Sequence, residues 1–150
     1  MSRSDNVTNI GIGAFLECNS LTNVYFKGNA PSVASPDFPH LAGDAFGGDP
    51  TTVYYLPGTT GWGPTFSGRP TKLWNPHAQT SDASFGVRQH RFGFNITGTP
   101  DIPLVVEATT NLAAQSWVPL QSCTLTNGLI YFNDAQWTNY PSRLYRIRSP

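Results

Sequence analysis

The sequence predicts a mainly β protein in which a short β-solenoid half precedes a small antiparallel β-sandwich. Composition is the first reason, because aromatic residues make up 13% of the 150 residues and charged residues only 12%, about half the usual share. The second is an apolar pattern near the start that recurs once, and the third is a run of short alternating segments after residue 85. We expect one part over residues 1–76, a linker over 77–84 and a second part over 85–150.

The first repeat unit is VTNIGIGAFLECNSLTNVYFKGN, residues 7–29. Its spacing predicts extended residues 7–10, about a turn and a half of helix over 12–18, and a strand over 21–27. In that strand Val24 and Phe26 share one face while Tyr25 points to the other. None of these elements buries its apolar face alone, so the unit needs stacked neighbours, and Cys18 is expected in the core.

A second, less regular copy follows. The segment GDAFGGDPTTVYYLPG repeats the order of GAFLECNSLTNVYFKG, so that Phe46 corresponds to Phe15 and Tyr54 to Tyr25. Residues 56–76 are dense in Gly, Pro and aromatic residues, which is typical of an irregular cap over the end of a repeat stack.

The first unit resembles a known repeat. Residues 7–31, VTNIGIGAFLECNSLTNVYFKGNAP, are similar to the BspA-like leucine-rich repeat, whose pattern is V-T-x-I-G-x-x-A-F-x-x-C-x-x-L-T-x-V-x-F. Residues 46–76 are similar to the capping segment of such arrays in bacterial surface proteins. The resemblance implies a short leucine-rich-repeat-like solenoid at the C-terminal end of a bacterial surface or secreted repeat protein. It also implies an extracellular or cell-surface location within a longer precursor, since the polar residues 1–6 lack the apolar run of a secretion signal.

The second half predicts five antiparallel strands, in a sandwich or open barrel. Asn127-Gly128 is expected to join two of them as a hairpin, because both positions accept φ > 0. The expected strands cover residues 87–95, 104–108, 117–126, 129–133 and 143–148.

This half resembles the C-terminal β-modules of large secreted proteins of environmental bacteria. The similarity lies in VEATTNL at 106–112, Trp117, Pro119-Leu120 and LYR at 144–146. Neither resemblance implies a catalytic residue or a cofactor.

Charge and hydropathy narrow the possible partners. Nine basic and nine acidic residues cancel, so no field draws the chain to nucleic acid. No apolar run approaches the roughly 18 residues of a membrane helix, so no membrane insertion is expected. We expect protein or glycan as the partner.

Catalytic residues are sought among the histidines and serines. His40, His77 and His90 lack metal-binding spacing, and His40 shares a loop with Asp44. Ser67 in TFSGRP is the nearest approach to a nucleophile elbow, although the first Gly is missing. If the protein is an enzyme, we expect a small hydrolase of an ester, lactone or glycoside that uses His40, Asp44 or Ser67.

Ligand-binding candidates come from oxygen donors, indoles and guanidinium groups. Asp44 and Asp49 could offer oxygens to Ca²⁺, with a β-turn role as the alternative. Trp62 and Trp74 could stack on sugar rings, with a core position as the alternative. Five arginines would form a basic stripe if the first and last strands of the second half were neighbours, with protection of edge strands as the alternative. They are Arg88, Arg91, Arg143, Arg146 and Arg148.

The function that these observations favour is a non-catalytic interaction module that binds protein or glycan. We also expect homo-oligomers formed through the N-terminal repeat half. Its stack begins at residue 7 without a cap, so that Ile10, Leu21, Val24 and Phe26 lie near an open end.

Overall fold

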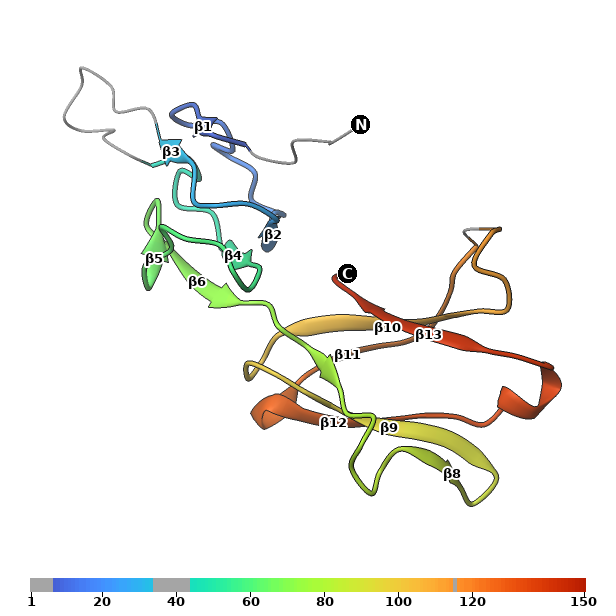
Figure 1. Ribbon diagram of the computed structural model, residues 1–150. Coiled ribbons are helices and arrows are strands. Elements are labelled where there is room, and N and C mark those ends of the chain that lie inside the picture. The colour runs from blue at the N-terminus through green and yellow to red at the C-terminus, as the bar shows by residue number, and fades with distance from the viewer. Residues whose placement is uncertain (1–6, 34–43, 115) are drawn as a thin grey trace. The chain divides into compact units, whose positions relative to one another are not determined.

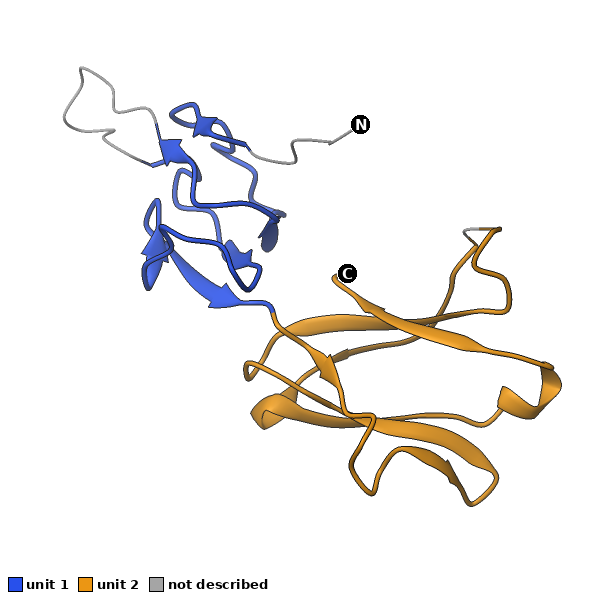
Figure 2. Ribbon diagram, in the orientation of Figure 1, with its two compact units in different colours: residues 1–74 blue, residues 75–150 orange. Residues whose placement is uncertain are grey.

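The computed structural model describes residues 7–33, 44–114 and 116–150 and is mainly β. It divides into two compact units, residues 1–74 and 75–150 (Figure 2). Residues 75–84, within which the sequence predicts a linker, belong to the second unit. Among the described residues, no helix has the length and apolar character needed to cross a membrane.

Unit 1 is built on a parallel stack of three short strands, β2, β4 and β6 (Figure 1). The first two pair in the register that the repeat predicts, with Val24 opposite Val53 and Tyr25 opposite Tyr54. The rings of Tyr25 and Tyr54 stack with centroids 4.8 Å apart. The strands of this unit are β1 (Asn9–Ile10), β2 (Asn23–Phe26), β3 (Ser32–Val33), β4 (Thr52–Tyr55), β5 (Thr65–Phe66) and β6 (Arg69–Leu73).

The helix expected over 12–18 is wrong, because this stretch folds into consecutive tight turns. The amides of Ala14, Leu16 and Cys18 each bond the carbonyl three residues earlier. Gly13 and Glu17 have φ of 59° and 62°, which a right-handed helix does not allow. The amide of Phe15 instead donates to the carbonyl of Ala45 in the second copy, 2.8 Å away. Hydrogen bonds between the first and the second repeat copy thus help to hold unit 1 together.

The core of unit 1 lies between the two copies. Phe46 is fully buried and stacks on Phe15 with ring centroids 5.2 Å apart. Val24 and Phe26 pack against the same cluster, as the sequence predicts. Cys18 does not, since its side chain is exposed. The expected irregular cap contains a regular element, because β6 continues the parallel sheet beyond β4.

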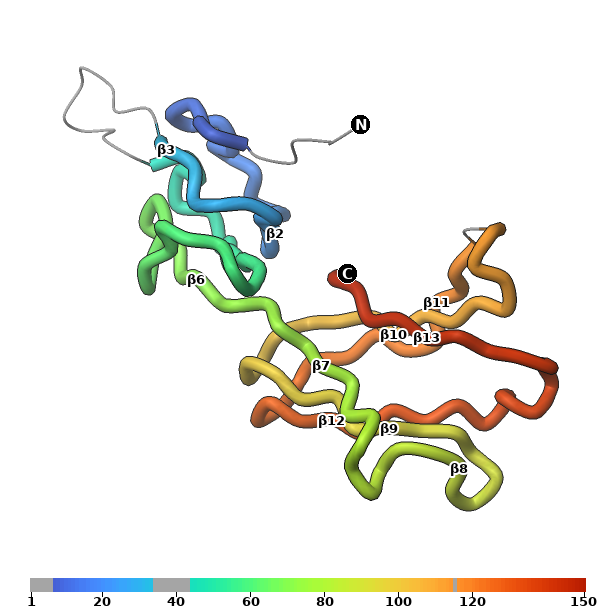
Figure 3. Tube along the Cα trace, viewed as in Figure 1, coloured from blue at the N-terminus to red at the C-terminus, as the bar shows by residue number. Residues whose placement is uncertain are grey.

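Unit 2 consists of two open sheets that lie in separate layers (Figure 1). One has the order β11-β10-β13 and the other β12-β9-β7, with β8 also paired to β9. Strand β7 pairs with β9 (Figure 3). It lies in the stretch over 77–84 that the sequence predicts to be a linker. The elements are β7 (His77–Ala78), β8 (Gly86–Arg88), β9 (Arg91–Thr97), β10 (Pro103–Thr109), β11 (Val118–Thr124), η1 (Thr126–Gly128), β12 (Leu129–Asp134), η2 (Trp137–Asn139) and β13 (Leu144–Arg148).

The two sheets meet through aromatic side chains. Tyr145 on β13 stacks on Phe92 of β9 with centroids 5.2 Å apart and contacts Phe132 of β12 edge to face. Ile96 and Phe132 are almost fully buried in this layer. Successive residues of a strand alternate in direction, so the neighbours of these side chains form the outer faces.

Two expectations for this half are wrong in detail. The strand expected over 87–95 is a hairpin of β8 and β9, because Gln89 and His90 adopt φ of 47° and 62° and turn the chain. Asn127 and Gly128 have the expected positive φ. However, the turn joins no hairpin, since β11 pairs with β10 while β12 pairs with β9. It instead carries the chain from one sheet to the other.

Candidate functional site

The candidate site lies on the outer face of the sheet formed by β8, β9 and β12. Phe92, Phe94 and Ile96 point inward from β9, so the residues between them point outward. The register places Tyr131 opposite Asn95 and Asn133 opposite Gly93. Arg88 stands opposite Arg91 on the same face. Three neighbouring strands thus present polar and aromatic side chains together.

A glycine makes room for the aromatic ring on this face. A Cβ atom on Gly93 would lie 2.4 Å from the hydroxyl of Tyr131 and 2.7 Å from its Cζ. It would also lie 2.5 Å from the carbonyl oxygen of Phe132. The phenol therefore reaches across the sheet onto the backbone of Gly93, while 40% of the Tyr131 surface remains exposed.

Beside this ring is an open hollow of about 690 Å³, a volume typical of small-molecule sites. Its lining is polar except for the phenol ring and includes no carboxylate. The lining residues are Ser84, Arg88, Gln89, Arg91, Asn95, Tyr131 and Asn133.

Hydrogen bonds fix several of these side chains. Arg91 Nη1 donates to Asn133 Oδ1 at 3.0 Å, across the strands. Ser84 Oγ accepts the amide of Asn95 at 2.8 Å, and Asn95 Nδ2 donates to Asp82 Oδ2 at 3.1 Å. The hydrogen bond from Ser84, and further bonds from Asn95 and backbone amides, lower the pKa of Asp82. This side of the hollow is therefore ordered by its own contacts.

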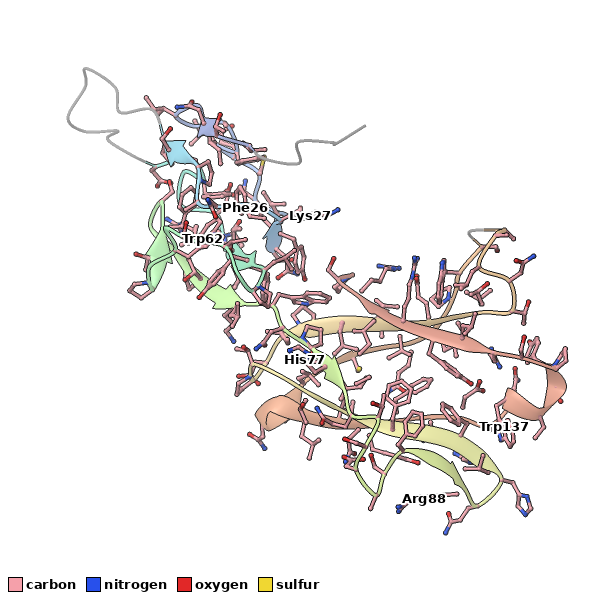
Figure 4. All side chains as sticks on the ribbon, viewed as in Figure 1. Phe26, Lys27, Trp62, His77, Arg88 and Trp137 are labelled. Atoms are coloured by element: carbon pink, nitrogen blue, oxygen red, sulfur yellow. The ribbon has the colours of Figure 1, made fainter. Side chains whose placement is uncertain are left out.

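Arg88 differs from the other lining residues. It is exposed at the end of β8, just before the turn at Gln89 and His90. Figure 4 shows its side chain on the outer side of the hairpin. Among the described residues, no hydrogen bond or ion pair holds its guanidinium group.

This arrangement is suited to binding. An exposed ring beside amide, hydroxyl and guanidinium groups offers a flat apolar platform flanked by donors and acceptors. A sugar has the complementary surface, with C–H groups on one face and hydroxyl groups around its edge. No lining residue is a histidine, cysteine or carboxylic acid, so the hollow lacks the usual general bases.

The catalytic candidates from the sequence lie elsewhere. Asp44 and Ser67 both lie in unit 1, where Asp44 Oδ1 accepts the amides of Phe46 and Gly47 at 2.9 and 3.0 Å. Ser67 Oγ accepts the amide of Ala45 at 2.6 Å. These bonds hold the turn that begins the second copy. His40 lies outside the described residues.

The metal candidates Asp44 and Asp49 are engaged with the backbone. Asp49 is buried, and its Oδ2 accepts the amide of Cys18 at 3.2 Å. Arg69 Nη1 donates to the Asp49 carbonyl at 2.9 Å, while its Nη2 lies 3.7 Å from Asp44 Oδ2. In the described part of the chain, no group of three or more His, Cys, Asp or Glu residues could hold a metal ion.

The two tryptophan candidates are half-buried in unit 1 rather than arranged as a surface row. Trp62 stacks on Tyr55 with centroids 5.3 Å apart and also contacts Phe26 (Figure 4). Trp74 meets Tyr25 edge to face at 6.4 Å. Both indoles therefore pack against neighbouring rings.

The expected basic stripe does not form, because β8 and β9 belong to one sheet and β13 to the other. Arg143 pairs with the buried Asp134 at 2.7 Å and lies over the Tyr140 ring. Arg146 pairs with Glu107 at 2.7 Å and lies over Trp117. The arginines thus separate into two groups that belong to different sheets.

Sequence reasoning missed the residues that make up the hollow, apart from Arg88 and Arg91. The available signal was the alternation in LIYFND, where Tyr131 and Asn133 occupy the face opposite Phe132. Comparison with models of known protein families, with curated proteins and with solved structures finds no match. The chemistry of the hollow therefore rests on its geometry.

Proposed function

We propose that the chain is a non-catalytic interaction module and that unit 2 binds saccharides in the hollow on β8, β9 and β12. The observation that carries this proposal is the phenol of Tyr131, which lies across Gly93 at the edge of a hollow of about 690 Å³. Polar side chains surround it, and those of Ser84, Arg91, Asn95 and Asn133 are held by hydrogen bonds. Saccharide recognition needs both parts, because stacking supplies affinity and the polar groups supply orientation.

The test is binding to an array of neutral and uronic acid oligosaccharides, followed by calorimetry with those that bind. Tyr131→Ala should weaken binding at least about tenfold, because it removes the stacking platform. Tyr131→Phe should retain most of the affinity, since the ring remains.

Leu129→Ala is the matched control for this experiment. Leu129 is 51% exposed on the same strand and face but does not line the hollow, so its loss should leave affinity unchanged. Equal weakening by Leu129→Ala and Tyr131→Ala, or no saccharide bound at millimolar concentration, would exclude the proposed site.

The wider setting follows from the resemblances. We propose that unit 1 is a leucine-rich-repeat-like β-solenoid of the BspA type and that unit 2 is a β-sandwich module. Both would belong to the C-terminal end of a bacterial surface or secreted repeat protein. In-register pairing of Val24 with Val53 supports the repeat, and the two layers of unit 2 support the sandwich. Binding of labelled protein to the surface of producing cells would test the location.

We further propose that two copies associate through unit 1. Among the described residues, β2 pairs with β4 on one side only, which leaves a strand edge available for another strand. Leu16, at 56% exposure, adds apolar surface, while Ile10 is buried and Leu21 half-buried. Light scattering of Val24→Pro, which places a ring without an N–H in β2, should show a smaller mass than the native chain. A monomeric native chain at millimolar concentration would contradict association.

A further inference from the structure

The hollow contains a pair of positive charges that no carboxylate neutralises among the residues that the structure describes. Arg88 on β8 and Arg91 on β9 are directly opposite in the antiparallel register and project to the same face. Residues in that relation have Cβ atoms about 5 Å apart, and like charges there are destabilising. Both side chains line the hollow.

The surroundings do not remove this repulsion. Arg91 contacts the neutral amide oxygen of Asn133 at 3.0 Å, and Arg88 has no hydrogen-bond or ion-pair partner within the described residues. The nearby carboxylate of Asp82 is bonded to Ser84 and Asn95 and does not line the hollow. An anion between the two guanidinium groups would relieve the repulsion.

We propose that the saccharide bound here is acidic and that its uronate carboxylate lies between Arg88 and Arg91 while a sugar ring stacks on Tyr131. The inference rests on the proposed saccharide binding and adds the class of ligand. Guanidinium groups suit a carboxylate, since their paired N–H donors match its two oxygens. Asn95, Asn133 and Gln89 would then contact sugar hydroxyl groups around the ring.

The experiment compares trigalacturonate with its fully methyl-esterified form by calorimetry on the full chain. The two probes share one sugar backbone and differ in the charge of the carboxyl groups. We expect the acid to bind at least about tenfold more tightly than the ester, because hydrogen bonds between charged groups are the stronger kind. Raising the salt concentration should weaken binding of the acid and leave binding of the ester unchanged.

Arg88→Gln removes the positive charge of Arg88 and leaves the other residues of the site in place, so it tests the contribution of this charge. It should weaken acid binding about tenfold and leave ester binding unchanged. Its unfolding temperature should not fall below that of the native chain, because Arg88 is exposed and its charge repels Arg91. Lys27→Gln removes one positive charge from an exposed residue of unit 1 and should change neither affinity.

Equal affinity for acid and ester, or weakening of both by Arg88→Gln, would overturn the acidic class while saccharide binding stands. Binding of triglutamate as tightly as trigalacturonate would also overturn it, and would indicate an acidic protein partner. Failure of every saccharide to bind would overturn the proposed function, and with it this inference.

Discussion

The hydroxyl of Tyr145 on β13 donates a 2.9 Å hydrogen bond to Asp134 on β12, so a buried carboxylate joins the two sheets of unit 2. The same carboxylate pairs with Arg143 at 2.7 Å and accepts the amide of Gln136 at 2.8 Å. Burial, followed by the hydrogen bond to Asp134, raises the pKa of Tyr145. This network connects the sheets at a point where their other contacts are aromatic.

Asp134→Ala should therefore be among the most destabilising substitutions in unit 2. It leaves the side chain of Arg143, only 8% exposed, without its counter-charge, which should cost about 3 kcal/mol. Tyr145→Phe removes one hydrogen bond and should cost about 1 kcal/mol. Urea unfolding with hydrogen exchange of peptides from residues 75–150 would measure both, and equal effects would contradict the charged role of Asp134.

Acid should weaken unit 2 through Glu107. Hydrogen bonding and charge from Arg148 and Arg146 lower the pKa of this buried carboxyl, against the opposing effect of burial. A carboxyl whose pKa is lower in the folded state stabilises it above the ordinary value of 4.5, and this stability is lost as pH falls through the lowered pKa.

Glu107→Gln should thus reduce stability by about 1–2 kcal/mol at pH 7 and flatten the decline of stability as pH falls below 4.5. Part of the decline should remain, since Asp82 also has a lowered pKa. Glu17→Gln, at an exposed carboxyl of unit 1, is the control. If the stability of unit 2, followed through its peptides, depended on pH in Glu107→Gln as it does in the native chain, the stabilising role of ionised Glu107 would be ruled out.

Alkali should weaken unit 1 through Tyr25. Burial, and then the charge of Tyr54, raise the pKa of Tyr25 to about 12 from its ordinary value of 10. The folded state therefore favours the neutral phenol, and the stability that it contributes is complete below pH 10 and lost as pH rises toward 12.

Tyr25→Phe should remove this alkaline loss. Its buried hydroxyl has no hydrogen-bond partner among the described residues, so the substitution should also raise stability at pH 7 by up to about 1 kcal/mol. Hydrogen exchange of peptides from residues 7–33 between pH 9 and 12 would show the effect. Tyr145→Phe, in unit 2, is the control and should leave the alkaline loss of stability in residues 7–33 unchanged.

Gly93→Ala should disturb both the sheet and the hollow. Its Cβ would overlap the hydroxyl of Tyr131, which can move, and the carbonyl of Phe132, which cannot without shifting β12. We expect a loss of about 2 kcal/mol and weaker saccharide binding. Gly11→Ala is the matched control, since a Cβ there meets no atom within 4 Å. A crystal structure of Gly93→Ala in which Tyr131 keeps its native position would contradict this account.

The strand content and the pairing of β2 with β4 could be predicted because they depend on local patterns. The same sequence spacing separates Val24 from Val53, Tyr25 from Tyr54 and Phe26 from Tyr55. Residues at a constant spacing occupy the same position in successive repeats, so they are expected to pair side by side. The helix expected over residues 12–18 does not form, because the amide of Phe15 bonds the carbonyl of Ala45, a residue 30 positions away that local helix propensity does not reflect.

The partners of the strands in unit 2 could not be predicted in the same way. Alternation shows which side chains share a face but not which strand lies beside them. It therefore predicts a hairpin at Asn127, where the chain instead passes from one sheet to the other. The hollow depends on the register of β9 against β12, which brings Gly93 and Tyr131 together across a separation of 38 positions. That relationship is a matter of tertiary structure.

The contact of Tyr131 with Gly93 also affects the entropy of binding. A flexible exposed tyrosine loses rotamer freedom when a ligand stacks on it, and this loss reduces affinity. Here the missing Cβ of Gly93 lets the phenol settle on the backbone before any ligand arrives. Much of the ordering is thus complete in the free protein, so the saccharide that we propose would lose less entropy on binding than it would at a mobile ring.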